Sequence, residues 1–220
     1  YILEDTKTSN VDFQTIYDAV YREAVSAEYD TVSGKVTESV QGISFDIDTA
    51  QRLLNAAKTG DAVEIPLTIT EPKVSKAELE AVLFRDCLSE MSTSIAGSSD
   101  GRITNIQLSA EAVNGTVLNP GDEFSFNDVV GERTTDKGYQ GAGAYAGGKS
   151  VIEVGGGICQ VSSTIYYCVL YSNLNVVERY NHMFTVGYLP LGLDATVSWG
   201  GPEFRFSNNT EYPIRIEAYV

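Results

Sequence analysis

Cys159 and His182 are the side chains of this sequence best suited to nucleophilic chemistry. The chain has one histidine and three cysteines among 220 residues, so a cysteine–imidazole pair can be assigned almost by elimination. A thiolate nucleophile needs a general base, and imidazole serves this purpose near neutral pH. A carboxylate should fix the imidazole tautomer. We expect Asp194 in this role, with Glu178 as the second choice.

The residues around Cys159 favour a reactive thiol. Gly155-Gly156-Gly157 precedes it, and the apolar pattern that follows predicts a helix from 159 to about 172. At the first turn of a helix, unpaired N–H groups and the helix dipole stabilise a thiolate. The same N–H groups can hold an oxyanion, and Gly156 and Gly157 would allow a substrate backbone to approach closely.

Structural roles for these residues stay open. A cysteine on a helix is often a small core residue. We favour that interpretation for Cys168 and also for Cys87, with a Cys87 disulfide as the alternative. His182 could serve only as a structural hydrogen-bonding group. The paired ligand spacing of zinc sites is absent, so we expect no metal and no cofactor.

Residues 143–150 match the Walker A phosphate-binding pattern in their letters. A phosphate loop follows an apolar strand and opens a helix, whereas here a strand over 151–154 is expected to follow. We interpret the match as chance and the run as a loop that lines a cleft beside the Cys159 turn.

The charge of the chain excludes one class of function. The net charge is −15 at pH 7, and binding to nucleic acid through phosphates needs clustered Lys and Arg, so we expect no nucleic-acid partner. No apolar stretch reaches the length of a membrane span. The abrupt start at Tyr1 indicates an excised soluble piece. We expect membrane attachment only through a segment that this sequence does not contain.

The sequence predicts an α+β fold in two domains, residues 1–85 and 86–220. The first is a small α+β domain, with helices near 13–24, 48–58 and 75–84 and a strand over 63–70. It lacks the reactive side chains of a catalytic site, so a binding or spacer role is expected. The second is β-rich and has one central helix that bears Cys159 at its N-terminus. Its expected strands cover 124–126, 151–154, 176–177, 184–189, 194–199, 204–206 and 214–220.

Four separated motifs of the second domain resemble the VanW family of bacterial cell-wall proteins. They cover residues 155–164, 178–182, 191–197 and 204–208 and occur in the family's order. The resemblance extends over about residues 86–220. Residues 1–84 resemble the peptidoglycan-binding module that often precedes a VanW domain. The family takes its name from glycopeptide-resistance gene clusters, although it is more widespread than resistance.

The resemblance implies an exported protein, cell-wall associated and membrane-anchored at full length, with peptidoglycan stem peptides as its partner. Some family members are regarded as L,D-transpeptidases that use the cysteine matching Cys159. By that resemblance Cys159 attacks a stem carbonyl, His182 accepts the thiol proton and Asp194 orients His182. Better-known L,D-transpeptidases carry the histidine just before the cysteine, whereas here it lies downstream.

Further side chains are expected to contact the stem peptide. The candidate substrate-binding residues are Gly156, Gly157, Gln160, Ser162, Ser163 and Arg179. For Arg179, an ion pair with Glu178 or another acid is the simpler alternative. A second reading of the whole domain also stays open. The protein would then be a non-catalytic peptidoglycan-binding module in which Cys159 is structural.

Overall fold

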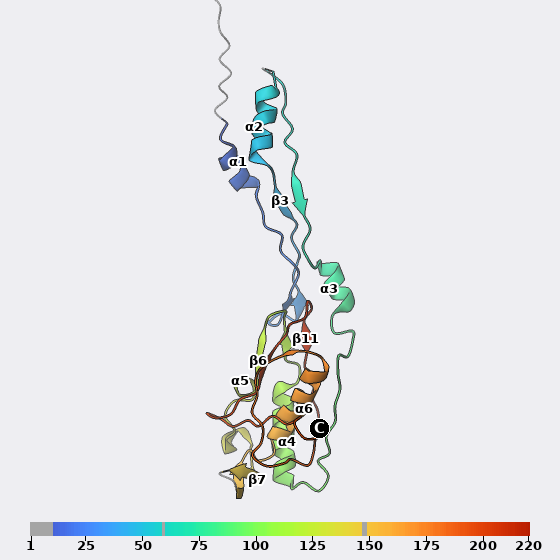
Figure 1. Cartoon of the computed structure of the whole chain (residues 1–220), viewed down its shortest axis with the longest axis vertical. Coiled ribbons are helices and arrows are strands. Elements are labelled where there is room, and N and C mark those ends of the chain that lie inside the picture. The colour runs from blue at the N-terminus through green and yellow to red at the C-terminus, as the bar shows by residue number, and fades with distance from the viewer. Residues whose placement is uncertain (1–10, 59, 147–148) are drawn as a thin grey trace, which may run out of the picture. The chain divides into compact units, whose positions relative to one another are not determined.

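The structure is a computed structural model that describes residues 11–58, 60–146 and 149–220. The chain divides into two compact units, with the division between Ala81 and Val82. Both contain helices and small antiparallel sheets, so the predicted α+β class is confirmed (Figure 1). Within the described ranges, no helix combines the length and apolar character needed to span a bilayer. The functional assignment of domains 1–85 and 86–220 stays a prediction.

The N-terminal unit is built from three short helices and two strand pairs. Its elements are α1 (Phe13–Val20), β1 (Tyr29–Asp30), β2 (Lys35–Val36), β3 (Gly42–Ser44), α2 (Ile47–Ala56), β4 (Thr68–Thr70) and α3 (Lys76–Val82). Strand β1 pairs with β2, and β3 pairs with β4. Asp12 and Asp46 cap α1 and α2 by accepting hydrogen bonds from first-turn N–H groups. A small core of Phe13, Phe45 and Ala50 joins these elements.

Two local predictions for this unit have different outcomes. The helix predicted near 75–84 is present and begins with a capping box: the Ser75 N–H donates to Glu78 Oε2 at 2.8 Å, and the Glu78 N–H donates to Ser75 Oγ at 3.2 Å. The strand predicted over 63–70 is shorter, because only Thr68–Thr70 pairs with β3. Pro66 has no N–H to donate to a neighbouring strand, which accounts for the late start.

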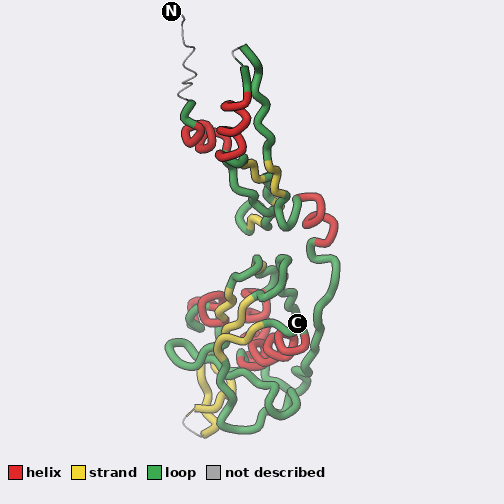
Figure 2. Tube along the Cα trace, turned by 45° about the horizontal axis from the view of Figure 1, so that its top comes forward, coloured by secondary structure: helices red, strands yellow, loops and turns green. Residues whose placement is uncertain are grey.

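The C-terminal unit holds the two longest helices and three small sheets (Figure 2). Its elements are α4 (Asp100–Val113), β5 (Val117–Leu118), β6 (Glu123–Ser125), α5 (Phe126–Val130), the 3-10 helix η1 (Thr135–Lys137), β7 (Gly141–Ala146), β8 (Lys149–Val154), α6 (Cys159–Tyr171), β9 (Asn175–Glu178), β10 (Arg205–Ser207) and β11 (Ile214–Arg215). Strand β10 lies between β6 and β9, β5 pairs with β11, and β7 pairs with β8, all antiparallel.

Buried aromatic side chains fix α6 against the three-stranded sheet. Phe124, Phe204 and Phe206 are at most 1% exposed, and Phe206 lies opposite Phe124 in the register of β10 and β6. Tyr166 of α6 meets Phe204 edge-on, with 5.6 Å between the ring centroids. These contacts hold the helix that bears Cys159 in a fixed position within the core. This position agrees with the predicted central helix and its start at Cys159.

Helix α4 corrects the prediction that the second domain has only one central helix. It contacts α6 and β7, and Figure 1 shows it beside α6. The spacing of apolar residues does not predict this helix, because its packing face carries polar side chains. Asn105 and Ser109 are fully buried. Asn105 Nδ2 donates to the carbonyl oxygens of Gln140 and Gly156 at 2.9 Å each, and its Oδ1 accepts from the Gln140 N–H at 2.8 Å.

Two predicted strands are wrong. Residues 184–189 and 194–199 form neither strand nor helix. The backbone of the second run bonds to other groups: the Ala195 N–H donates to Ser163 Oγ at 2.9 Å, and the Thr196 N–H donates to Tyr180 O at 2.8 Å. A serine hydroxyl and a backbone carbonyl outside any sheet thus replace a neighbouring strand, and the alternation of apolar residues reflects burial rather than sheet pairing.

The letters of the Walker A pattern fall on the hairpin of β7 and β8 rather than on the predicted loop. Residues 147 and 148 of the run lie outside the described residues. The hairpin strands pair antiparallel from Gly141 with Val154 to Ala146 with Lys149. A strand hairpin differs from the strand–loop–helix geometry of a phosphate loop.

Replacing Phe204 by alanine should lower the free energy of unfolding of the C-terminal unit by about 3–5 kcal/mol, because it removes a fully buried ring. Urea unfolding followed by fluorescence would measure this, since Trp199 is the single tryptophan and lies in this unit. The matched control is Tyr219→Ala, at a side chain that is 87% exposed. Equal effects of the two substitutions would contradict the assigned core.

Candidate active site

A tight glycine turn delivers Cys159 to the start of α6. Gly155 and Gly157 have φ values of +85° and +107°, a region that glycine adopts without strain. A Cβ on Gly156 would lie 2.5 Å from the carbonyl oxygen of Ala142, so no larger residue fits there. Gly156 therefore allows a close approach to the protein's own backbone, and its contact with a substrate stays a prediction.

Most first-turn N–H groups of α6 are already used. The Gln160 N–H donates to Gly157 O at 3.0 Å, and the N–H groups of Val161 and Ser162 donate to Ile158 O at 2.9 and 3.3 Å. Among the described residues, the N–H groups of Cys159 and Gly157 have no acceptor. These two N–H groups are thus the unpaired backbone donors around the start of α6.

The thiol of Cys159 lies half-buried against the irregular segment 194–198. Its Sγ is 3.4 Å from Val197 O, 3.5 Å from Val197 N and 3.7 Å from Thr196 Oγ1. The ring of His182 is close enough to lower the pKa of this thiol. The neutral thiol can donate to the Val197 carbonyl, whereas the thiolate can accept from the Val197 N–H, so both protonation states have a partner.

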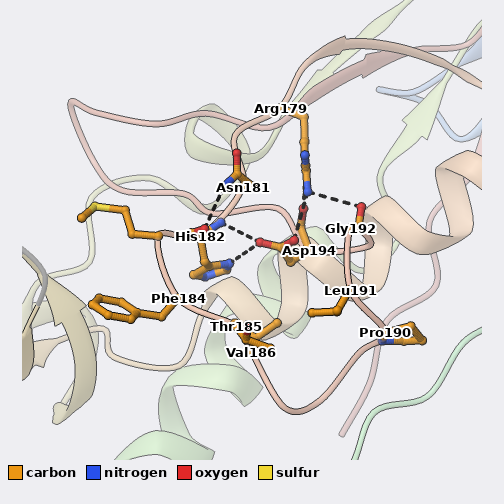
Figure 3. A pocket seen from close by; sticks show the side chains of 11 residues that line it. Arg179, Asn181, His182, Phe184, Thr185, Val186, Pro190, Leu191, Gly192 and Asp194 are labelled. Atoms are coloured by element: carbon orange, nitrogen blue, oxygen red, sulfur yellow. Dashed lines mark hydrogen bonds and ion pairs between the residues drawn. The ribbon is translucent and has the colours of Figure 1, made fainter.

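Asp194 holds the imidazole of His182. The two residues are joined by His182 Nδ1 and Asp194 Oδ2 at 2.8 Å, and the His182 backbone N–H donates to the same oxygen at 2.6 Å (Figure 3). Both side chains are about nine-tenths buried, with 11% and 12% exposed. Because Nδ1 is engaged by the carboxylate, Nε2 is the nitrogen left to exchange a proton with Cys159.

Arg179 completes this arrangement from the other side of the carboxylate. Its Nη2 lies 3.0 Å from Asp194 Oδ1, and its Nε donates to Asp194 O at 2.6 Å. The guanidinium also lies over the ring of Tyr166, 5.1 Å from the centroid. Arg179 therefore forms an ion pair with an acid, here Asp194, as the simpler alternative expected. Its contact with a substrate stays a prediction.

The charges of the three groups support one another. Burial opposes the thiolate of Cys159, but hydrogen bonds from His182 and the Val197 N–H outweigh it and lower the pKa of the thiol. Burial also opposes the imidazolium of His182, yet its bonds to Cys159 and Asp194 raise the pKa of the ring. The bonds from His182 and the charge of Arg179 overcome the burial of Asp194 and lower its pKa. These shifts favour a thiolate–imidazolium pair.

Ser162, Ser163 and Gln160 form hydrogen bonds within the protein, and their contact with a substrate stays a prediction. Both serines are fully buried and bond the carbonyl oxygen of Cys159, at 3.2 Å from Ser162 and 2.6 Å from Ser163. They also bond the backbone of Ala195, which ties α6 to the segment after Asp194. Gln160 is 2% exposed, and its amide donates to Thr93 and Ser94.

The other two cysteines lie away from these bonds. Cys87 is exposed and carries a free thiol, which corrects the prediction that it packs in the core. It lies in the irregular segment between α3 and α4, which has no buried face of its own. Cys168 of α6 is partly exposed, and burial raises the pKa of its thiol. Within the described ranges, no cluster of three His, Cys, Asp or Glu side chains is arranged to hold a metal ion.

An open cavity of about 400 Å³ lies beside His182 and Asp194 (Figure 3). Its lining is Arg179, Asn181, His182, Met183, Phe184, Thr185, Val186, Pro190, Leu191, Gly192 and Asp194. Met183 and Leu191 are 79% and 80% exposed, so apolar side chains stand at its edge. The sequence did not single out this loop as a cavity wall, because its residues show no spacing typical of a site.

A cysteine whose pKa is lowered by a histidine, with that histidine held by an aspartate, is an arrangement suited to nucleophilic acyl transfer. Residues 101–220 match the protein family described as VanW like protein, and the chain belongs to this family. It is 46% identical over 156 residues to the uncharacterized protein YoaR of Bacillus subtilis (strain 168). It is 30% identical over 122 residues to the vancomycin B-type resistance protein VanW of Enterococcus faecalis (strain ATCC 700802 / V583).

The two alignments cover 71% and 53% of this chain. They cover 51% and 44% of the relatives, so the chain spans about half the length of the curated relatives it matches. No solved structure matches the chain.

Cys159 should react with iodoacetamide near neutral pH faster than Cys168, because hydrogen bonds lower the pKa of one thiol and burial raises that of the other. In His182→Ala the rate of alkylation at Cys159 should fall toward that of Cys168. Burial then raises the pKa of the Cys159 thiol without the opposing effect of His182. Peptide mapping by mass spectrometry measures all thiols in one sample, with exposed Cys87 as the internal reference. Unchanged reactivity in His182→Ala would contradict the pair.

Ser163→Ala should lower the free energy of unfolding by about 1–3 kcal/mol, because it leaves the buried Ala195 N–H without its acceptor. It should also slow alkylation of Cys159 while the rate at Cys87 stays unchanged. Denaturant unfolding and the same peptide mapping check both effects. Loss of stability with normal Cys159 reactivity would show that Ser163 supports the fold but not the site.

Proposed function

We propose that this chain is a cell-wall protein that acts on peptidoglycan stem peptides by cysteine-dependent acyl transfer, in the manner of an L,D-transpeptidase. The observation that carries the proposal is the imidazole of His182, which Asp194 holds at 2.8 Å and which lowers the pKa of the Cys159 thiol. Membership of the VanW family supports the cell-wall setting, since one relative is named a vancomycin B-type resistance protein.

In the first half-reaction the Cys159 thiolate attacks the carbonyl carbon that precedes the last residue of a donor stem. The N–H groups of Cys159 and Gly157 hold the resulting oxyanion. The imidazolium of His182 gives its proton to the departing amine as the amide C–N bond breaks. The products are a thioester on Cys159 and a free amino acid, which is D-alanine for a tetrapeptide donor.

In the second half-reaction the amine of a neighbouring stem attacks the thioester carbonyl. Neutral His182 removes a proton from this amine, and Cys159 leaves as the thiolate when the C–S bond breaks. The new amide bond is the cross-link, and the thiolate–imidazolium pair is restored. Asp194 keeps Nδ1 of His182 in one tautomer through both steps.

The setting of this chemistry forms part of the same proposal. Peptidoglycan stems lie outside the cytoplasm, so the protein would be extracytoplasmic and cell-wall associated, and held at the membrane by a further segment. The N-terminal unit would bind peptidoglycan. Its residues up to Ala81 contain neither cysteine nor histidine, which favours binding over catalysis in that unit.

Incubation with a disaccharide-tetrapeptide should give an intact-protein mass increase equal to the donor minus D-alanine. The adduct should be absent in Cys159→Ala and reduced roughly a thousandfold or more in rate in His182→Ala. Cys168→Ala is the matched control and should form the adduct normally. Intact mass spectrometry over time measures all four proteins.

A chain that binds the muropeptide without forming an adduct would contradict acyl transfer. That result would favour the alternative reading, a non-catalytic peptidoglycan-binding module. An adduct that persists in Cys159→Ala but disappears in Cys168→Ala would also overturn the assignment of the nucleophile.

A further inference from the structure

Arg133 carries a hydrogen-bond donor that the protein leaves unsatisfied. The residue follows α5 and is partly buried. Its Nη1 donates to Gly131 O at 2.8 Å. Its Nη2 is buried and has no hydrogen-bond partner among the described residues. Buried polar atoms without a partner are rare, and one at a functional site points to a group that is supplied from outside.

The positive charge of Arg133 is also unpaired. Within the described ranges it forms no ion pair. The carboxylate of Glu203, one of the charges that act on it, already accepts bonds from Asn127, Ser125 and Phe204. A buried guanidinium normally forms an ion pair with a carboxylate, because burying a charge without a partner costs free energy.

Arg133 lies next to the turn that presents the nucleophile. A Cβ on Gly155 would come 2.9 Å from Cβ of Arg133, so the side chain starts out in contact with the glycine turn. Burial lowers the pKa of Arg133, and the charge of the Cys159 thiolate is among those that oppose this effect. The charge of the Cys159 thiolate therefore acts on the unpaired guanidinium of Arg133.

We propose that Arg133 binds the C-terminal carboxylate of the acyl donor, on the leaving-group side of the bond that Cys159 attacks. This inference rests on the proposed function. The planar guanidinium presents paired N–H groups that match the two oxygens of a carboxylate. A donor that ends one residue after the attacked carbonyl places its terminal carboxylate close to the thiol, whereas a longer stem does not. Arg133 thus restricts the site to the last residue of a stem.

The test compares two donors that differ in one charge, a disaccharide-tetrapeptide with a free C-terminal carboxylate and the same compound with a C-terminal amide. Calorimetric titration into the whole chain carrying Cys159→Ala measures binding without turnover, and acylation of the wild-type thiol is followed by intact mass. The carboxylate should bind roughly 10- to 100-fold more tightly than the amide. Adding Arg133→Gln should abolish this preference, and Arg133→Lys should keep part of it.

Arg102→Gln is the matched control for the loss of one positive charge beside the turn. Arg102 packs against Gly157, but its Nη1 already donates to Ser98 Oγ at 3.1 Å. This variant should keep the preference for the carboxylate. If the preference for the carboxylate weakened equally in both variants, the loss of one positive charge would explain it. That result would overturn the specific role of Arg133.

The outcomes separate this inference from the function on which it rests. A carboxylate preference that depends on Arg133, without any acyl-enzyme in the wild type, would overturn acyl transfer and retain Arg133 as a recognition residue. Acyl-enzyme formation with equal use of acid and amide would retain the proposed function and overturn the inference. A preference that survives Arg133→Gln, or the absence of binding by either donor, would also overturn it.

Discussion

The carboxylate of Asp194 is the constraint on which the site depends. It accepts from the backbone and the ring of His182 through one oxygen and pairs with Arg179 through the other. Residues 179–204 contain neither helix nor strand, so no sheet or helix backbone ladder holds this long segment. A few side-chain bonds take the place of that ladder, and Asp194 carries three of them. Its own backbone oxygen accepts from Arg179 as well.

Hydrogen bonds from side chains also hold the start of α6. Ser162 and Ser163 bond both the Cys159 carbonyl and the backbone of Ala195. Asn105 of α4 holds the carbonyl oxygen of Gly156 in the glycine turn. The nucleophile is thus positioned by buried polar groups whose hydrogen bonds have defined directions, whereas apolar packing alone would allow small shifts. These bonds also explain why polar residues occupy the inner faces of both long helices.

Some of this arrangement was predictable from the sequence. The glycine run before Cys159 and the apolar spacing after it gave the correct start of α6. The single histidine left one candidate base, and Asp194 was the nearest acid downstream on the predicted strand. The start of α3 followed from the Ser75 and Glu78 capping box, because that signal depends only on neighbouring residues.

Other features depend on tertiary contacts and left no local signal. Helix α4 escaped prediction because Asn105 and Ser109 interrupt its apolar face. The segment after Asp194 looks like a strand, yet its N–H groups bond to Ser163 and Tyr180. Arg133 gave no signal at all, since an unpaired donor is visible only when its surroundings are known.

The most direct test of the account is the pKa of His182, read by NMR titration of the imidazole nitrogens. The chain has a single histidine, so the signal needs no assignment. The pKa of the ring should lie above its ordinary value of 6.5, because the effects of Cys159 and Asp194 outweigh the effect of burial. The pKa should fall in Cys159→Ala and in Asp194→Asn. A pKa at or below 6.5 that neither substitution changes would contradict the thiolate–imidazolium pair.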